Sequence, residues 1–69
     1  MKRRVIIEGM SCEKCAQRVE KALQGLDENI RVSVNLKKKT AVLSSKNEIV
    51  DALIRNAVTA AGYEVTDIL

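Results

Sequence analysis

The order in which strand-like and helix-like periodicities follow one another restricts the fold of this chain more than any other feature. Residues 29–36 (NIRVSVNL) alternate apolar and polar side chains, which predicts a strand with one buried face. Further short strands are predicted at residues 3–8 (RRVIIE), 40–45 (TAVLSS) and 63–68 (YEVTDI). Ala41 and Leu43 are expected to point inward from the third strand, whereas the pattern leaves the inward face of the last strand open.

Two segments between the strands carry apolar residues at helical steps of three and four. The first stripe consists of Cys15, Val19, Ala22, Leu23 and Leu26, and the second of Val50, Ile54, Ala57, Val58 and Ala61. Ser11 is the expected N-cap of the first helix and Asn47 that of the second. Gly25 lies near the end of the first helix, and Gly62 is expected to stop the second.

The predicted element order is strand, helix, strand, strand, helix, strand. Two helices on one face of a four-stranded antiparallel sheet bury both stripes at once, which predicts an α+β, ferredoxin-like β-α-β-β-α-β sandwich. Right-handed crossovers would place the first and third strands at the centre of the sheet. Sixty-nine residues have room for one core, so residues 1–69 are expected to form a single domain.

Composition argues against several classes of partner. No apolar run approaches the roughly 18–20 residues that span a membrane, so direct membrane insertion is not expected. The basic start is followed by too short an apolar piece for a secretory signal, and a cytoplasmic location is expected. Single-stranded nucleic acid is bound by stacking on aromatic side chains, and Tyr63 is the one aromatic residue, so nucleic acid is not expected as a partner.

The two cysteines, Cys12 and Cys15, lie two residues apart at the start of the first predicted helix. Unpaired amides and the positive end of the helix dipole favour thiolate over thiol at such a position, and Lys14 adds a positive charge between them. Because a stable disulfide is unusual in the cytoplasm, the pair is interpreted as a metal or redox site.

The supply of donors favours a soft monovalent ion. The chain has no His and no third Cys, whereas structural zinc takes four ligands and iron–sulfur clusters are usually held by four cysteines. Cu(I) prefers thiolates and accepts two of them, and Ag(I) and Hg(II) are chemically similar. Dithiol redox work is the alternative, although the chain lacks the Trp and Pro that accompany a thioredoxin-type motif.

The segment GMSCEKC (residues 9–15) resembles the loop of the heavy-metal-associated domain, and the likeness extends to VNL (residues 34–36) and AAGYEV (residues 60–65). It implies that Cys12 and Cys15 are the metal ligands and that Met10 turns inward beneath the loop without binding metal. Tyr63 would approach the metal, as in bacterial cytosolic copper chaperones. Lys14 stands where some members carry His.

The resemblance implies a copper chaperone rather than an enzyme. Such a protein holds Cu(I) through two thiolates and transfers it by ligand exchange to the metal-binding domain of a copper-transporting P-type ATPase. Lys14, Arg18 and Lys21 are expected to steer docking onto an acidic surface. A monomer is expected without metal, with metal-bridged pairs as a loaded form. The alternatives are an isolated N-terminal domain of a heavy-metal ATPase and a mercury- or zinc-binding relative, with Glu13 as an added acidic ligand.

Overall fold

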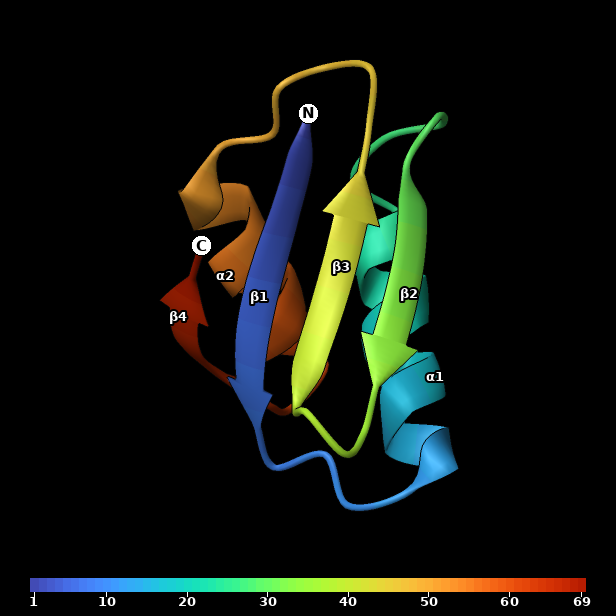
Figure 1. The fold of residues 1–69 in the computed structure, drawn as a ribbon, viewed down its shortest axis with the longest axis vertical. Helices are drawn as coiled ribbons and strands as arrows, with labels where there is room; N and C mark the ends of the chain where they lie inside the picture. Colours follow the sequence, from blue (N-terminus) through green and yellow to red (C-terminus); the bar gives the residue numbers. More distant parts are fainter.

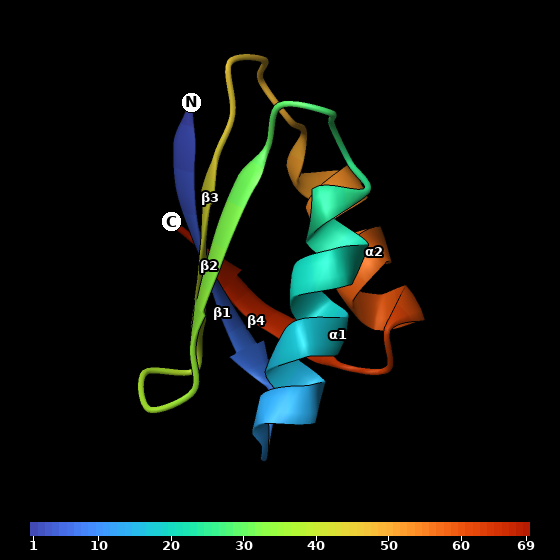
Figure 2. The ribbon, with the colours of Figure 1, turned by 90° about the vertical axis from the view of Figure 1, so that its right-hand side faces the viewer.

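The chain forms two layers, a twisted sheet and a pair of helices that cover one of its faces (Figure 1, Figure 2). The computed structural model describes all residues from 1 to 69. The elements in chain order are β1 (Lys2–Glu8), α1 (Glu13–Gln24), β2 (Arg31–Asn35), β3 (Thr40–Ser44), α2 (Asp51–Ala60) and β4 (Glu64–Ile68). No helix is both long enough and apolar enough to span a bilayer. The predicted α+β, ferredoxin-like sandwich is confirmed.

The sheet has the strand order β2-β3-β1-β4, with every neighbouring pair antiparallel. The first and third strands are therefore central, as the right-handed crossovers predict. Alternate residues of β1 and β3 point toward the helices and are fully buried, among them Val5, Ile7, Ala41 and Leu43. The helices contribute their stripes to the same core, with Val19, Leu23, Ile54 and Val58 fully buried.

The inward face of β4, which the sequence leaves open, is set by an irregularity in its pairing with β1. Ile6 pairs with Asp67 and Ile7 pairs with Val65, so Thr66 is an extra residue on the β4 side. Such a bulge changes the alternation of side chains by one step. Val65 and Ile68, three residues apart, can therefore both pack against the core.

The expected N-caps were both wrong. Helix α1 begins after Cys12, whose backbone is extended, and no side chain caps it. Helix α2 begins after Val50, which is 58% exposed and so lies outside the buried stripe. The side chain of Asn47 instead donates to Asp27 Oδ2 at 3.1 Å. Asp27 also accepts from the backbone N–H of Asn29, and these bonds, Asn29 first, hold the pKa of its carboxyl below the ordinary value.

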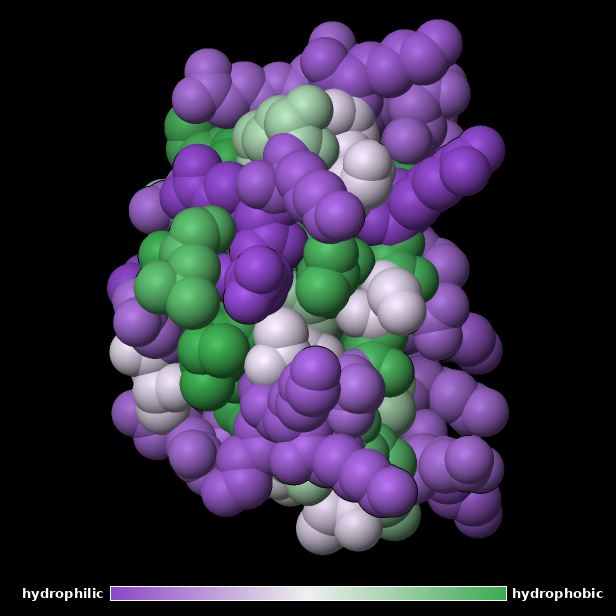
Figure 3. All heavy atoms as spheres, in the orientation of Figure 1, coloured by the Kyte–Doolittle hydropathy of each residue, from purple (hydrophilic) through white to green (hydrophobic).

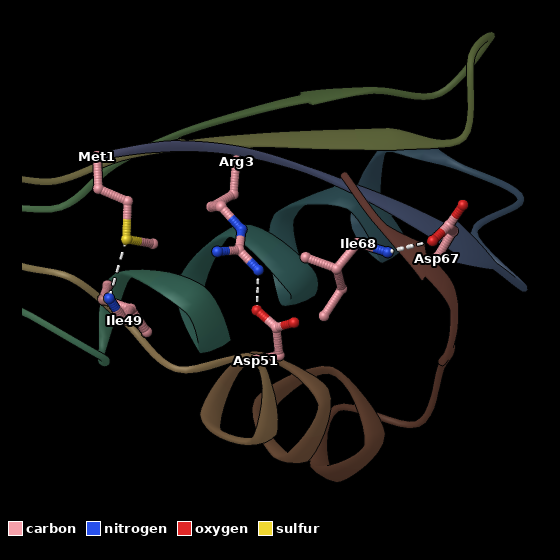
Figure 4. A network of polar contacts seen from close by, with 6 residues as sticks. All are labelled: Met1, Arg3, Ile49, Asp51, Asp67 and Ile68. Carbon is pink, nitrogen blue, oxygen red and sulfur yellow. Dashed lines mark hydrogen bonds and ion pairs between the residues drawn. The ribbon is translucent and has the colours of Figure 1, made fainter.

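Polar contacts tie the start of β1 to the start of α2 (Figure 4). The guanidinium of Arg3 pairs with the Asp51 carboxylate in the first turn of α2. Near it, the backbone N–H of Ile49 donates to the Met1 sulfur at 3.0 Å, and Ile49 is buried although it lies outside the predicted stripe. These contacts fix the start of α2 at the end of the sheet where β1 begins, whereas the cysteine loop follows the other end of β1.

Candidate metal centre

The cysteines lie in the connection from β1 to α1, at the end of the molecule where β1 finishes (Figure 1). Gly9 begins this connection with φ of 99°, a conformation that L side chains rarely adopt. Met10 follows and is 8% exposed, within the hydrophobic core. The loop is therefore anchored by a buried thioether directly before Ser11 and Cys12, and the expectation that Met10 turns inward agrees with this placement.

The two sulfurs lie close together on an accessible surface. Cys12 is exposed and Cys15 half-buried, neither forms a disulfide, and the distance from Cys12 Sγ to Cys15 Sγ is 3.3 Å. Cys12 holds the N-cap position with an extended backbone, and Cys15 lies in the first turn of α1. No group of three or more His, Cys, Asp or Glu side chains is positioned to hold an ion. The site thus offers two convergent sulfur donors.

Cys15 is electrostatically prepared to ionise. Hydrogen bonding from the Tyr63 side chain, then from the Ser11 backbone and Cys12, lowers the pKa of Cys15 from an ordinary 9.0 to about 6. Donors that favour the thiolate also favour a metal-bound sulfur, because both carry negative charge. Cys15 is therefore expected to be largely thiolate at neutral pH before any ion arrives.

Tyr63, in the segment between α2 and β4, closes one side of the loop. A Cβ added at Gly9 would lie 3.3 Å from Tyr63 Cδ1, so the ring packs directly over the start of the loop. The hydrogen bond with Cys15 and burial raise the pKa of Tyr63, while the charge of Arg18 opposes that rise. Tyr63 thus lies near both Cys15 and Arg18, which are about one turn apart on α1.

Not every expected site residue joins this cluster. The side chain of Lys14 is exposed and takes part in no hydrogen bond or ion pair, as is also true of the Lys21 side chain. Lys14 is therefore an exposed surface charge beside the cysteines. Sequence reasoning missed the contribution of Ser11 to Cys15 and the proximity of Arg18 to Tyr63. The spacing of three residues between Cys15 and Arg18 was a signal for the second, because residues at that spacing are neighbours on a helix.

Replacing Gly9 with alanine is expected to destabilise the chain by about 1–2 kcal/mol, because φ of 99° is strained for any residue with a Cβ. Gly25→Ala is the matched control. There φ is −72° and the new Cβ would make ordinary contacts, so stability should stay level or rise by about 0.4–1 kcal/mol. Urea unfolding of the reduced, metal-free variants gives the free energy of unfolding of each. An equal loss of stability in Gly9→Ala and Gly25→Ala would contradict the expectation.

Removing the Tyr63 hydroxyl is expected to raise the pKa of Cys15 from about 6 toward its ordinary value, because the largest stabilising donor is lost. In the parent chain the thiolate contribution to stability is complete above the ordinary pKa of 9.0 and is lost as pH falls through about 6. In Tyr63→Phe this loss should begin at the same pH near 9.0, be complete at a pH higher than about 6, and be smaller in total. The pH dependence of thiol alkylation in the metal-free chain tests the shift, with Cys12→Ser present in both proteins so that one thiol reports. An unchanged profile would show that the hydroxyl does not act on Cys15.

Comparison with known proteins identifies relatives of this arrangement. The model of the family described as "Heavy-metal-associated domain" matches residues 4–64. The copper chaperone CopZ of Enterococcus hirae is 35% identical over 65 residues, which cover 93% of this chain and 94% of that protein. Copper-transporting ATPase 1 of Rhizobium meliloti is 41% identical over 59 residues, but the match spans 86% of this chain and only 7% of the ATPase.

A solved structure shows the same fold. The copper chaperone Atx1 from Synechocystis superposes with a TM-score of 0.80 at 34% identity, covering 90% of this chain and 95% of that one. The likeness therefore includes the order of strands and helices as well as the sequence. Together with the family match over residues 4–64, it shows that the chain belongs to the heavy-metal-associated domain family and is similar to small bacterial copper chaperones.

Proposed function

We propose that this chain is a cytoplasmic copper chaperone that binds one Cu(I) through the sulfurs of Cys12 and Cys15. The observation that carries the proposal is the pair of sulfurs 3.3 Å apart at an exposed loop, with no other donor cluster in the chain. The similarity to copper chaperones over nearly the whole length supports it. No catalytic role is proposed, because the site presents an ion to a partner and transforms nothing.

The donor set favours Cu(I) over harder ions. Two thiolates suit a soft ion that accepts low coordination, whereas zinc in structural sites takes four ligands. Two thiolates and one Cu(I) together carry one negative charge. The amides at the start of α1 and the nearby Lys14 would offset that charge. Tyr63 and Met10 would support the site without binding the ion, Tyr63 from above Cys15 and Met10 from the core.

Transfer is proposed to proceed by ligand exchange. A thiolate of the partner adds to the two-coordinate Cu(I), which gives a three-coordinate bridge, and one of the two original sulfurs then leaves as thiolate. A second thiolate of the partner replaces the other original sulfur in the same way, which completes the transfer. The number of sulfur–copper bonds rises from two to three and returns to two, and the oxidation state of copper does not change. Because no step releases the ion into water, the barrier for exchange between two docked proteins remains low.

The proposed partner is a metal-binding domain of a copper-transporting P-type ATPase. Segments of such ATPases are 38–41% identical to most of this chain, so the partner would present a loop of the same kind. The exposed side chains of Lys14, Arg18 and Lys21 make one face of α1 basic, which favours an acidic docking surface. The alternative is that residues 1–69 are themselves part of such a transporter, since the ATPases match equally well. The mass of the native protein distinguishes the two.

The test is a competition titration against a strong Cu(I) chelator, followed by transfer. We expect one Cu(I) per chain at low protein concentration, with Ag(I) competing and Zn(II) bound more weakly. The loaded chain is then mixed with an isolated metal-binding domain of a copper-transporting ATPase in the presence of the chelator. Copper should reach the domain faster than it reaches the chelator. If copper reaches the domain only after release into solution, where the chelator can capture it, the exchange mechanism is refuted. If the chain binds Zn(II) more tightly than Cu(I), the choice of metal is refuted.

A further inference from the structure

The sheet face that the helices leave uncovered is basic at the end where β1 begins (Figure 2). Alternate residues of β1 point into the core, so Lys2 and Arg4 lie on the uncovered face, where both are exposed. Arg31 lies on the same face, because Ser44 of β3 pairs with both Arg31 and Lys2. Figure 3 views this face and shows hydrophilic atoms across its upper part, where β1 begins. Lys2, Arg4 and Arg31 define what we term the basic half of the face.

The charges of the basic half are not neutralised within the chain. Neither of the two ion pairs of the molecule includes one of its three cations. An acidic residue, Glu28, lines a hollow together with Arg31 and Lys46, so its charge is offset by that of Lys46. The remaining outward side chains of these rows, Ser33 and Ser44, are uncharged. The basic half therefore presents an unbalanced positive charge to the solvent.

Apolar side chains lie among these cations. Lys2 and Arg4 line a hollow together with Val42 and Leu69. Leu69 is 63% exposed, and two backbone hydrogen bonds with Arg4 hold it beside β1. Basic side chains around exposed apolar atoms suit the boundary between lipid headgroups and acyl chains, because each kind of group meets its preferred surroundings there.

The other end of the face, next to the cysteine loop, is not basic. The acidic side chains there outnumber the basic ones, with Glu8, Glu64 and Asp67 against Lys38 and Lys39, whereas Lys37 lines the groove between α1 and β2. Lys2 and Glu8 stand at opposite ends of β1, which at about 3.3 Å per residue are about 20 Å apart. The Debye length at 0.1 M salt is only about 10 Å. A charged surface near the basic half is therefore little affected by the charges of the other end.

We propose that the basic half of the uncovered face docks on an anionic phospholipid bilayer. Each Lys or Arg near such a surface strengthens binding about fivefold at low salt, so three of them together give about a hundredfold. The acidic end of the face is repelled, so the chain docks tilted, with the start of β1 toward the lipid. The cysteine loop is then raised from the surface and stays accessible to a protein partner. Docking does not involve the cysteines and so does not depend on the proposed copper site.

The area of the basic half favours a bilayer over an acidic protein. The chain measures 30 × 20 × 18 Å, and the sheet face is seen along the shortest axis (Figure 1). Half of that face offers on the order of 300 Å², whereas each partner in a specific protein complex contributes about 800 Å². A bilayer attracts the cations through long-range charge and needs no closely packed contact.

The test measures how much of the reduced, metal-free chain sediments with vesicles of phosphatidylglycerol and phosphatidylcholine at low salt. Vesicles of phosphatidylcholine alone should bind far less, and about 0.5 M NaCl should release the chain from the anionic vesicles. Lys2→Glu and Arg4→Glu each replace an attraction by a repulsion, so each should weaken binding about tenfold or more. Arg55→Glu makes the same change in net charge at an exposed position of α2 and should bind within about threefold of the parent chain.

Bicelles of the same lipids with a spin-labelled headgroup then show which residues lie near the surface. Amide signals of residues 2–4 and of Arg31 should broaden more than those of residues 9–15. A parent chain that does not sediment with anionic vesicles overturns the proposal, as does broadening that is strongest at residues 9–15. Equal losses in Arg4→Glu and Arg55→Glu would make net charge the cause and would overturn it too. A parent chain that binds poly-glutamate but not the vesicles would assign the basic half to an acidic protein, with the same consequence.

Discussion

A chain carrying both Cys12→Ser and Cys15→Ser is expected to lose Cu(I) affinity by more than about a thousandfold, because hydroxyl oxygen is a poor ligand for a soft ion. Both sulfurs of the site are removed, and no other group of potential ligands lies elsewhere in the chain. The competition titration with a Cu(I) chelator measures the loss. Each single substitution leaves one sulfur and should give an intermediate loss. Retention of tight binding in the double variant would refute the assignment of the site.

The matched control for this prediction is Met10→Leu. Met10 carries the third sulfur near the loop, but its side chain is 8% exposed and packs within the core. A swap of Met for Leu conserves volume and usually costs less than about 1.5 kcal/mol. We expect Cu(I) affinity within a few-fold of the parent chain. A loss as large as that of the cysteine variants, in a protein that remains folded by circular dichroism, would make Met10 a ligand.

Leu23→Ala is expected to destabilise the metal-free chain by about 2–5 kcal/mol, because it removes a fully buried side chain and leaves a cavity between α1 and the sheet. The total stability of a chain of this size is only about 3–10 kcal/mol. A large fraction of the variant should therefore be unfolded in the absence of denaturant. Urea titration monitored by circular dichroism gives the free energy of unfolding.

Leu53→Ala provides the comparison, since it makes the same chemical change on the outer face of α2. Leu53 is 48% exposed, and surface substitutions of this kind usually change stability by less than about 0.5 kcal/mol. Similar losses in the two variants would indicate that the core is not where the structure places it. A large loss in Leu53→Ala alone would mean that its exposed side chain is covered by a partner or a second copy under the conditions used.

The sequence was sufficient for the order and layering of the elements, because each depends on a local periodicity. Ala41 and Leu43 point inward as their alternation predicts, and Val19 and Leu23 lie on the buried stripe of α1. Helix starts were less predictable. Asn47 has the right chemistry for a cap, but its side chain bonds to Asp27, a residue 20 positions away, and the helix begins later. Long-range contacts of this kind leave no local signal.

The candidate metal site, like the fold, was only partly predictable from local sequence patterns. The close approach of Cys12 and Cys15 follows from their spacing at a helix start, which a local argument can predict. The position of Tyr63 could not be derived from periodicity, because it depends on how the segment after α2 returns to the loop. The family resemblance supplied it, and the packing of the ring against Gly9 agrees with that expectation.

The boundary of α1 runs between the two sulfurs, and this gives them different mechanical characters. Cys15 belongs to the first helical turn, whereas Cys12 stands at the N-cap with an extended backbone and an exposed side chain. One sulfur is thus attached to the regular helix and the other to the extended segment that precedes it. In the proposed exchange, an incoming thiolate would meet the more exposed Cys12 first, while the helix would hold the orientation of the Cys15 sulfur.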